Sequence, residues 1–139
     1  MFQEYAYHLR SLPEVMSGKK KIDTGAEVMG PYSLGISVKD HIWLSGQIDN
    51  TQDGIEAQTR GTLAKIDGLL EVAGSSKHDL VKVTVLMTDI GHYSAMNEVY
   101  SEWLGDAMPP SRAAYAVRDL PGGALIEIVC EAFRGSGIQ

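Results

Sequence analysis

The sequence predicts an α+β fold, in which a mixed β-sheet carries two helices on one of its faces. Three observations lead to this class. The predicted segments follow the order hairpin, helix, strand, helix, hairpin, so strands outnumber helices. Each helix has a single apolar stripe, which indicates that only one of its faces is buried. The last strand is apolar on both of its sides, so we expect a partner subunit to cover the sheet face without helices.

The first half of the chain predicts three strands and one long helix. Lys20–Asp23 begins the first strand. Ser33–Val38 and His41–Gly46 alternate in polarity on either side of a short turn, which is typical of a β-hairpin. After a polar loop, apolar residues recur at helical spacing up to Ala73, and Gly74 is a natural C-terminal stop.

The second half predicts the strand Leu80–Thr88, a helix from about His92 to Leu104, and two further strands. Those strands are Arg112–Val117 and Ala124–Cys130. The link between them is rich in proline, glycine and aspartate, which are turn formers. The two strands are therefore expected to pair as an antiparallel hairpin.

Arg112 and Glu127 are the candidate functional residues on these two strands. The expected hairpin places Arg112 opposite Glu127 or within about two residues of it. Both charges would then face a small volume walled by aliphatic side chains, where charges are costly unless they are paired or used. A guanidinium fork suits a substrate carboxylate, and a nearby carboxylate suits the holding or activation of a water.

Composition limits the classes of function. The 139 residues, 44% of them hydrophobic, favour one domain over residues 19–139, preceded by an N-terminal extension over residues 1–18. The formal net charge of −6 argues against a nucleic-acid partner. The only basic run, Lys19–Lys21, is interpreted as a solvated strand edge.

Cysteine usage and hydropathy point to a reducing cytoplasm. The single cysteine, Cys130, lies in an apolar strand and is expected to be a buried, unreactive hydrophobe. No Cys/His cluster suggests a metal site, and no segment has the apolar length of a membrane span. The first residues also lack the apolar core of a signal peptide.

Eight short stretches, in register from about Ile22 to Phe133, resemble the Rid (YjgF) family of reactive-intermediate deaminases, also labelled endoribonuclease L-PSP. They are Gly30–Ser33, Leu44–Gln47, Glu56–Thr59, Glu71–Ser75, Val81–Val85, Asn97–Tyr100, Pro110–Arg112 and Ile126–Ile128. The resemblance implies a chorismate-mutase-like fold and a homotrimer with active sites between subunits. It also implies hydrolysis of enamines and imines such as 2-aminoacrylate to a 2-oxo acid and ammonia, without metal or cofactor.

The resemblance assigns roles to particular residues. Arg112 matches the arginine that binds the substrate carboxylate, and Glu127 matches the glutamate that holds or polarises the attacking water. Other positions border the pocket: Tyr32, Ser45, Gly46, Asn97 and Ala114. Ala114 departs from the pattern, because many members have a cysteine there. Tyr115 and Ala116 also differ from the commoner residues, which leaves substrate preference less defined than reaction type.

Structural interpretations compete with these roles. Arg112 could pair with an acidic neighbour such as Asp119, and Glu131 lies on the same strand face as Glu127 and competes for its role. Three aromatic residues are expected in the core: Trp43, Tyr100 and Trp103. The alternative functions are a non-catalytic, chaperone-like trimer that binds small carboxylates, a 2-aminomuconate deaminase, and a ribonuclease or translation inhibitor.

Overall fold

The computed structural model describes residues 18–137, so the expectation of an N-terminal extension falls outside the described residues except at Gly18. The strands are β1 (Lys19–Ile22), β2 (Gly35–Val38), β3 (His41–Leu44), β4 (Leu80–Met87), β5 (Ser111–Ala116) and β6 (Ile126–Phe133). The helices are α3 (Ile55–Val72) and α4 (Tyr93–Leu104), with short 3₁₀ turns at Lys77–Asp79, Ile90–His92 and Pro121–Gly123.

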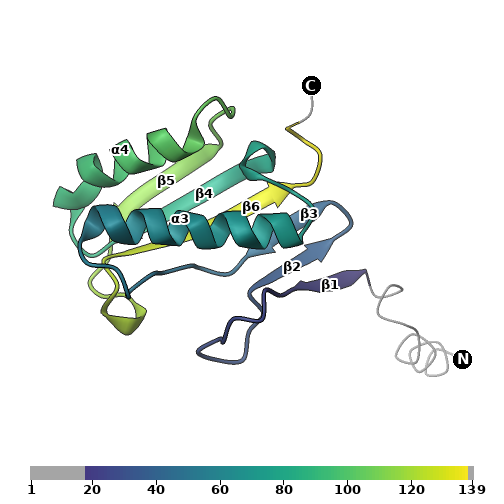
Figure 1. Cartoon of the computed structure of the whole chain (residues 1–139), viewed down its shortest axis with the longest axis horizontal. Helices are drawn as coiled ribbons and strands as arrows, with labels where there is room; N and C mark the ends of the chain where they lie inside the picture. The colour runs from purple at the N-terminus through teal and green to yellow at the C-terminus, as the bar shows by residue number, and fades with distance from the viewer. Residues whose placement is uncertain (1–17, 138–139) are drawn as a thin grey trace, which may run out of the picture.

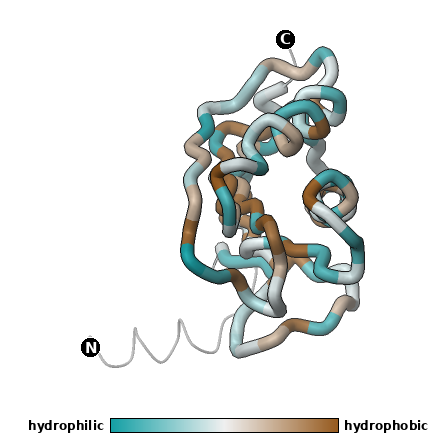
Figure 2. Tube along the Cα trace, turned by 90° about the vertical axis from the view of Figure 1, so that its left-hand side faces the viewer, coloured by the Kyte–Doolittle hydropathy of each residue, from teal (hydrophilic) through white to brown (hydrophobic). Residues whose placement is uncertain are grey.

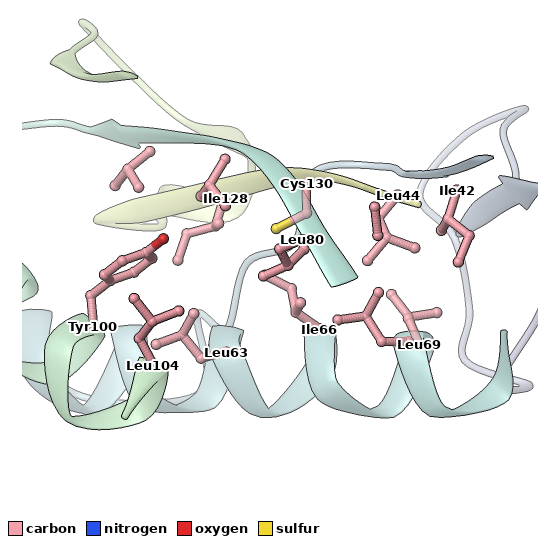
Figure 3. Packing of buried hydrophobic residues seen from close by; sticks show 14 of the residues in the cluster. Ile42, Leu44, Leu63, Ile66, Leu69, Leu80, Tyr100, Leu104, Ile128 and Cys130 are labelled. Atoms are coloured by element: carbon pink, nitrogen blue, oxygen red, sulfur yellow. The ribbon is translucent and has the colours of Figure 1, made fainter. Parts of the chain in front are cut away.

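The six strands form one mixed sheet in the order β1-β2-β3-β6-β4-β5, and both helices cover the same face of it (Figure 1). Apolar stretches of the strands gather beside the helices (Figure 2). Ile66 and Leu69 of α3 and Tyr100 of α4 point toward Cys130 and its neighbours on the strands (Figure 3). The predicted α+β class, with two helices on one face of a mixed sheet, is therefore confirmed.

Most of the predicted elements are present close to their expected bounds. The long helix ends before Gly74, which has φ +73°, a conformation that glycine adopts without strain. The first hairpin pairs Val38 with His41, and Lys39 in its turn has φ 53°. The basic run lies on the edge strand β1 and is exposed, as predicted. No helix in residues 18–137 is long and apolar enough to cross a membrane.

The predicted hairpin of the last two strands is wrong. β5 pairs in parallel with β4, and β6 pairs antiparallel with the other side of β4, so β4 separates the two strands. The reason is the helix between β4 and β5, because a helical crossover returns the chain as a parallel neighbour. β6, whose helix-facing residues are all buried, instead takes a central position between β3 and β4. A turn-rich link did not outweigh these two effects.

The sheet face opposite the helices, called the open face below, carries exposed aromatic residues. Trp43, Tyr115 and Phe133 are 38%, 50% and 48% exposed, respectively. The expectation that Trp43 lies in the core is wrong, because Ile42 and Leu44 on either side of it turn toward the helices. Tyr100 is buried and Trp103 is partly buried against the core, as expected.

Candidate active site

The Arg112 guanidinium is held by two tyrosine side chains of α4. Its Nη2 donates a hydrogen bond to the Tyr93 hydroxyl at 3.0 Å. Its central carbon lies 4.7 Å from the centre of the Tyr100 ring, within the range of a cation–π interaction. Burial raises the pKa of Tyr100, and the nearby Arg112 charge opposes part of that increase. The helix thus supports a charged side chain that starts from the edge strand β5.

Asn97 and Ala114 belong to the same region. Asn97 is half-buried on α4, one helical turn after Tyr93, and both line a surface depression of about 440 Å³. Ala114 lies two residues after Arg112 on the same side of β5 and packs against the core. We call Arg112, Tyr93, Asn97, Tyr100 and Ala114 the arginine half-site.

Glu127 lies half-buried on β6, with its side chain against Gly46. A Cβ atom at Gly46 would stand 2.8 Å from the Glu127 carboxyl carbon, closer than real Cβ contacts allow. Burial raises the pKa of Glu127 above its usual range. Within residues 18–137 no hydrogen bond or ion pair satisfies its carboxylate. Glycine at position 46 therefore makes the space in which this carboxylate sits.

A β-bulge brings Gly46 to Glu127. Trp43 pairs with Glu131, and Gln47 pairs with Ile128, so four residue steps on one side oppose three on the other. The extra residue falls at the Ser45–Gly46 segment. Bulges often occur beside active sites, where they re-aim a side chain.

Ser45 and Tyr32 complete the surroundings of the bulge. The Ser45 hydroxyl donates to the Ser33 carbonyl at 2.6 Å, which ties the bulge to the loop before β2. Tyr32, next to Ser33, is 44% exposed, and its hydroxyl accepts a hydrogen bond from the Met29 backbone N–H at 3.3 Å. We call Glu127, Gly46, Ser45 and Tyr32 the glutamate half-site.

The competing ion pair of Arg112 with Asp119 that the sequence allowed does not occur among the described residues. Asp119 lies 3.4 Å from Arg118, and both are exposed; no ion pair of Arg112 occurs in residues 18–137. Glu131 lies 3.6 Å from Nε2 of His41, so it has a partner where Glu127 has none among these residues. Arg112 and Glu127 thus remain unpaired in the described part of the chain.

Within one chain the two half-sites lie on opposite faces of the sheet. Val83 is in register with both Arg112 and Cys130, so the Arg112 side chain shares the helix-covered face with Cys130. Leu86 is in register with Glu127, which places Glu127 on the open face. The expectation that Arg112 and Glu127 face one volume within one chain is therefore wrong. A site that uses both residues needs a second copy.

Sequence reasoning missed Tyr93 and assigned Tyr100 to the core alone. The signal was present in the helix pattern, because Tyr93, Asn97 and Tyr100 recur at the spacing of one helix face. Because Asn97 lies on this aromatic face, the tyrosines beside it could have been expected to contact a polar side chain as well as the core. What it could not reveal was that this stripe faces the edge strand that carries Arg112.

Comparison with known proteins extends this picture. Residues 24–134 match the family model described as endoribonuclease L-PSP. A RutC family protein of Pyrococcus abyssi is 39% identical over 113 residues, covering 76% of this chain and 88% of that protein. A 2-iminobutanoate/2-iminopropanoate deaminase of Capra hircus is 35% identical, covering 77% of this chain and 82% of that enzyme.

A solved structure leads to the same family. A Rid family protein of Yersinia pestis superposes with a TM-score of 0.79 at 35% identity, covering 83% of this chain and 98% of its own. The family match spans strands β2 to β6 and both helices of this chain. The chain therefore belongs to the endoribonuclease L-PSP family, whose members also carry the names RutC and Rid.

Proposed function

We propose that this protein hydrolyses enamine and imine intermediates, such as 2-aminoacrylate, to 2-oxo acids and ammonia. One observation carries the proposal: Arg112 is held in place by aromatic side chains, and no carboxylate neutralises it within residues 18–137. A positioned guanidinium without a partner suits the carboxylate of a small substrate. Relatives named as 2-iminobutanoate/2-iminopropanoate deaminases support the same reaction class.

Glu127 supplies the second chemical requirement. The enamine first takes a proton from solvent on carbon to become a protonated imine, whose C2 is electrophilic. A water adds to C2 while Glu127 accepts one of its protons, which gives a carbinolamine. Glu127 then returns this proton to the nitrogen, the C–N bond breaks to release ammonia, and the hydroxyl loses its proton as the carbonyl of the 2-oxo acid forms. A carboxylate whose pKa is raised by burial is a better base than an ordinary glutamate, because it holds a proton more tightly.

The proposed site forms between copies of the chain. Arg112 and Glu127 lie on opposite faces of one sheet, so the arginine half-site of one copy must meet the glutamate half-site of another. The open face carries Trp43, Tyr115 and Phe133, which a second copy would cover. We propose a homotrimer, as the resemblance to the Rid family implies, because cyclic symmetry repeats the same contact at each site.

The test is an assay of 2-oxo acid and ammonia release from enamines generated in situ from several amino acids. Arg112→Ala is expected to lose at least about 100-fold in kcat/KM while the assembly stays folded. Arg112→Lys should fail in a similar way, because it keeps the charge and loses the bidentate fork. Arg118→Lys is the matched control, since Arg118 is exposed and pairs only with its neighbour Asp119 among the described residues.

Glu127→Gln separates an enzyme from a binding protein. We expect this variant to bind a 2-oxo acid product normally and to turn over slowly, because its shape is kept and its basicity is lost. Tyr32→Phe should have a smaller effect than either change. Wild-type turnover by folded Arg112→Ala would refute the proposed roles. Binding of carboxylates by a wild-type protein without turnover would favour the non-catalytic, chaperone-like alternative.

A further inference from the structure

Two tyrosines contact the same guanidinium in different ways. Tyr100 presents its ring to Arg112, while its hydroxyl is buried without a hydrogen-bond partner among the described residues. Tyr93 presents its hydroxyl, which accepts from Nη2 at 3.0 Å, and its ring centre is 5.7 Å from the central carbon. Tyr100 therefore acts through its aromatic face, whereas Tyr93 adds a hydrogen-bond acceptor to a longer ring contact.

These contacts restrict different motions of the guanidinium. Packing over an aromatic ring limits the tilt and the height of the guanidinium but leaves it free to turn above the ring. A directional hydrogen bond to one nitrogen removes that remaining rotation. Arginine has a long side chain with many rotamers, and a site that fixes them in advance avoids that ordering cost when the ligand binds.

We propose that the Tyr93 hydroxyl is a positioning group for Arg112, which orients the remaining N–H groups toward a substrate carboxylate. This inference rests on the proposed role of Arg112 in carboxylate binding. Tyr93 is 39% exposed at the start of α4, so its hydroxyl reaches Arg112 from the rim of the arginine half-site. Only one of the five guanidinium N–H groups is used by this contact, and the others stay available for a ligand.

The chain offers a matched pair of variants. Tyr93→Phe removes the hydroxyl that bonds Arg112, and Tyr100→Phe removes a hydroxyl that has no partner within residues 18–137. Both changes keep the aromatic ring. Tyr93→Phe is expected to lower kcat/KM about tenfold, mainly through a higher KM, because hydrogen bonds to charged groups are stronger than neutral ones. Tyr100→Phe keeps the ring that packs on Arg112 and removes no hydrogen bond to it, so it is expected to lower kcat/KM much less than Tyr93→Phe does.

A double-mutant cycle separates positioning from a structural tie between α4 and β5. If Tyr93 acts through the Arg112 fork, Tyr93→Phe should cause no further loss in an Arg112→Lys background. The melting temperature and the oligomeric state should match those of the wild type. A tenfold loss that persists in the Arg112→Lys background, or that appears only together with a lower melting temperature, would overturn the positioning role.

Two readouts do not depend on turnover. Calorimetry with 2-oxobutanoate should show about tenfold weaker binding for Tyr93→Phe and a much smaller change for Tyr100→Phe. NMR of ¹⁵N-arginine-labelled protein should show slower rotation about the Arg112 Nε–Cζ bond in the wild type than in Tyr93→Phe. Equal rotation rates in the two proteins would refute the inference. A wild type without turnover or binding would refute the proposed function, while the rotation rates would still decide the role of Tyr93.

Discussion

The two half-sites of this protein hold their charged groups by opposite means. In the arginine half-site, contacts with two tyrosines of α4 hold the guanidinium of a long side chain at the edge of the sheet. In the glutamate half-site, the absence of a side chain at Gly46 leaves space for the Glu127 carboxylate at a bulge. The first arrangement restrains a long side chain, and the second partly buries a carboxylate.

This difference explains how each group is prepared for its proposed task. Arg112 needs orientation, since a guanidinium stays charged in any setting and acts through the direction of its fork. Glu127 needs a changed affinity for protons, which burial provides by raising its pKa. The sheet keeps the two groups apart on its opposite faces, so neither can neutralise the other within one chain.

The largest expected effect comes from mixing two variants that each have little activity. If each site takes Arg112 from one copy and Glu127 from another, Arg112→Ala and Glu127→Gln chains refolded together should form some intact sites. Random mixing in equal amounts should restore about a quarter of the wild-type sites. The measurement is deaminase activity per site before and after the two variants are refolded together.

Separate refolding of each variant is the control for this mixing experiment, and it should give no recovery. Absence of recovery in mixtures shown by native mass spectrometry to contain both chains would mean that the two half-sites do not meet between copies. The comparison of the half-sites would then describe two unrelated features of the surface.

A methyl group at Gly46 should damage the glutamate half-site alone. Gly46→Ala brings a Cβ to 2.8 Å from the Glu127 carboxyl carbon, so the carboxylate must move. We expect kcat to fall about tenfold or more, because small displacements of a catalytic group are costly. Carboxylate binding by the arginine half-site should change much less, as measured by calorimetry.

Gly68→Ala is the matched control for this substitution. Nothing lies within 4 Å of a Cβ added at Gly68, which lies within α3. This change should preserve activity and raise the free energy of unfolding by about 0.5–1 kcal/mol. Full activity of Gly46→Ala would show that the close packing against Glu127 has no catalytic importance.

The pH dependence of kcat/KM should report the glutamate half-site. Because burial raises the pKa of Glu127, its basic form is lost at a higher pH than that of an ordinary glutamate near 4.3. Activity should therefore fall as the pH decreases through this raised pKa, and the residual activity of Glu127→Gln should lack this step. An acidic limb at or below the usual glutamate value would contradict the assignment.

The ionisation of Glu127 should also change the free energy of unfolding, but here the protonated form is the favourable one. A carboxyl group with a raised pKa in the folded state favours folding when protonated, so its ionisation costs stability as the pH rises. Glu127→Gln should therefore gain stability relative to the wild type at neutral pH and lose this advantage in acid. Chemical unfolding at several pH values measures the difference.

The smallest effect is expected at Cys130, which lies behind the arginine half-site. Cys130 is 2% exposed, and burial raises the pKa of its thiol to about 12. Little thiolate exists at neutral pH, so native protein should react with a thiol reagent only as fast as it opens. Rapid labelling of the native protein, measured against unfolded protein as the reference, would show that this part of the core is accessible.

The sequence by itself determined the local structure and the candidate residues. Helical spacing predicted α3 and α4, and alternation predicted β2, β3 and β4. Motif residues identified Arg112 and Glu127, and alternation along the strand predicted the burial of Cys130. These features depend on neighbours a few residues apart, so a single sequence contains them.

Only the tertiary structure decided how the strands are ordered and which face each charge occupies. β4 lies between β5 and β6 because the helical crossover returns β5 as a parallel neighbour of β4, while β6, with its buried helix-facing residues, pairs with the other side of β4. Likewise, the Tyr93 contact to Arg112 and the fit of Glu127 against Gly46 join segments far apart in sequence. Periodicity describes which side chains share a face of one element, whereas the meeting of two elements depends on how the whole chain packs.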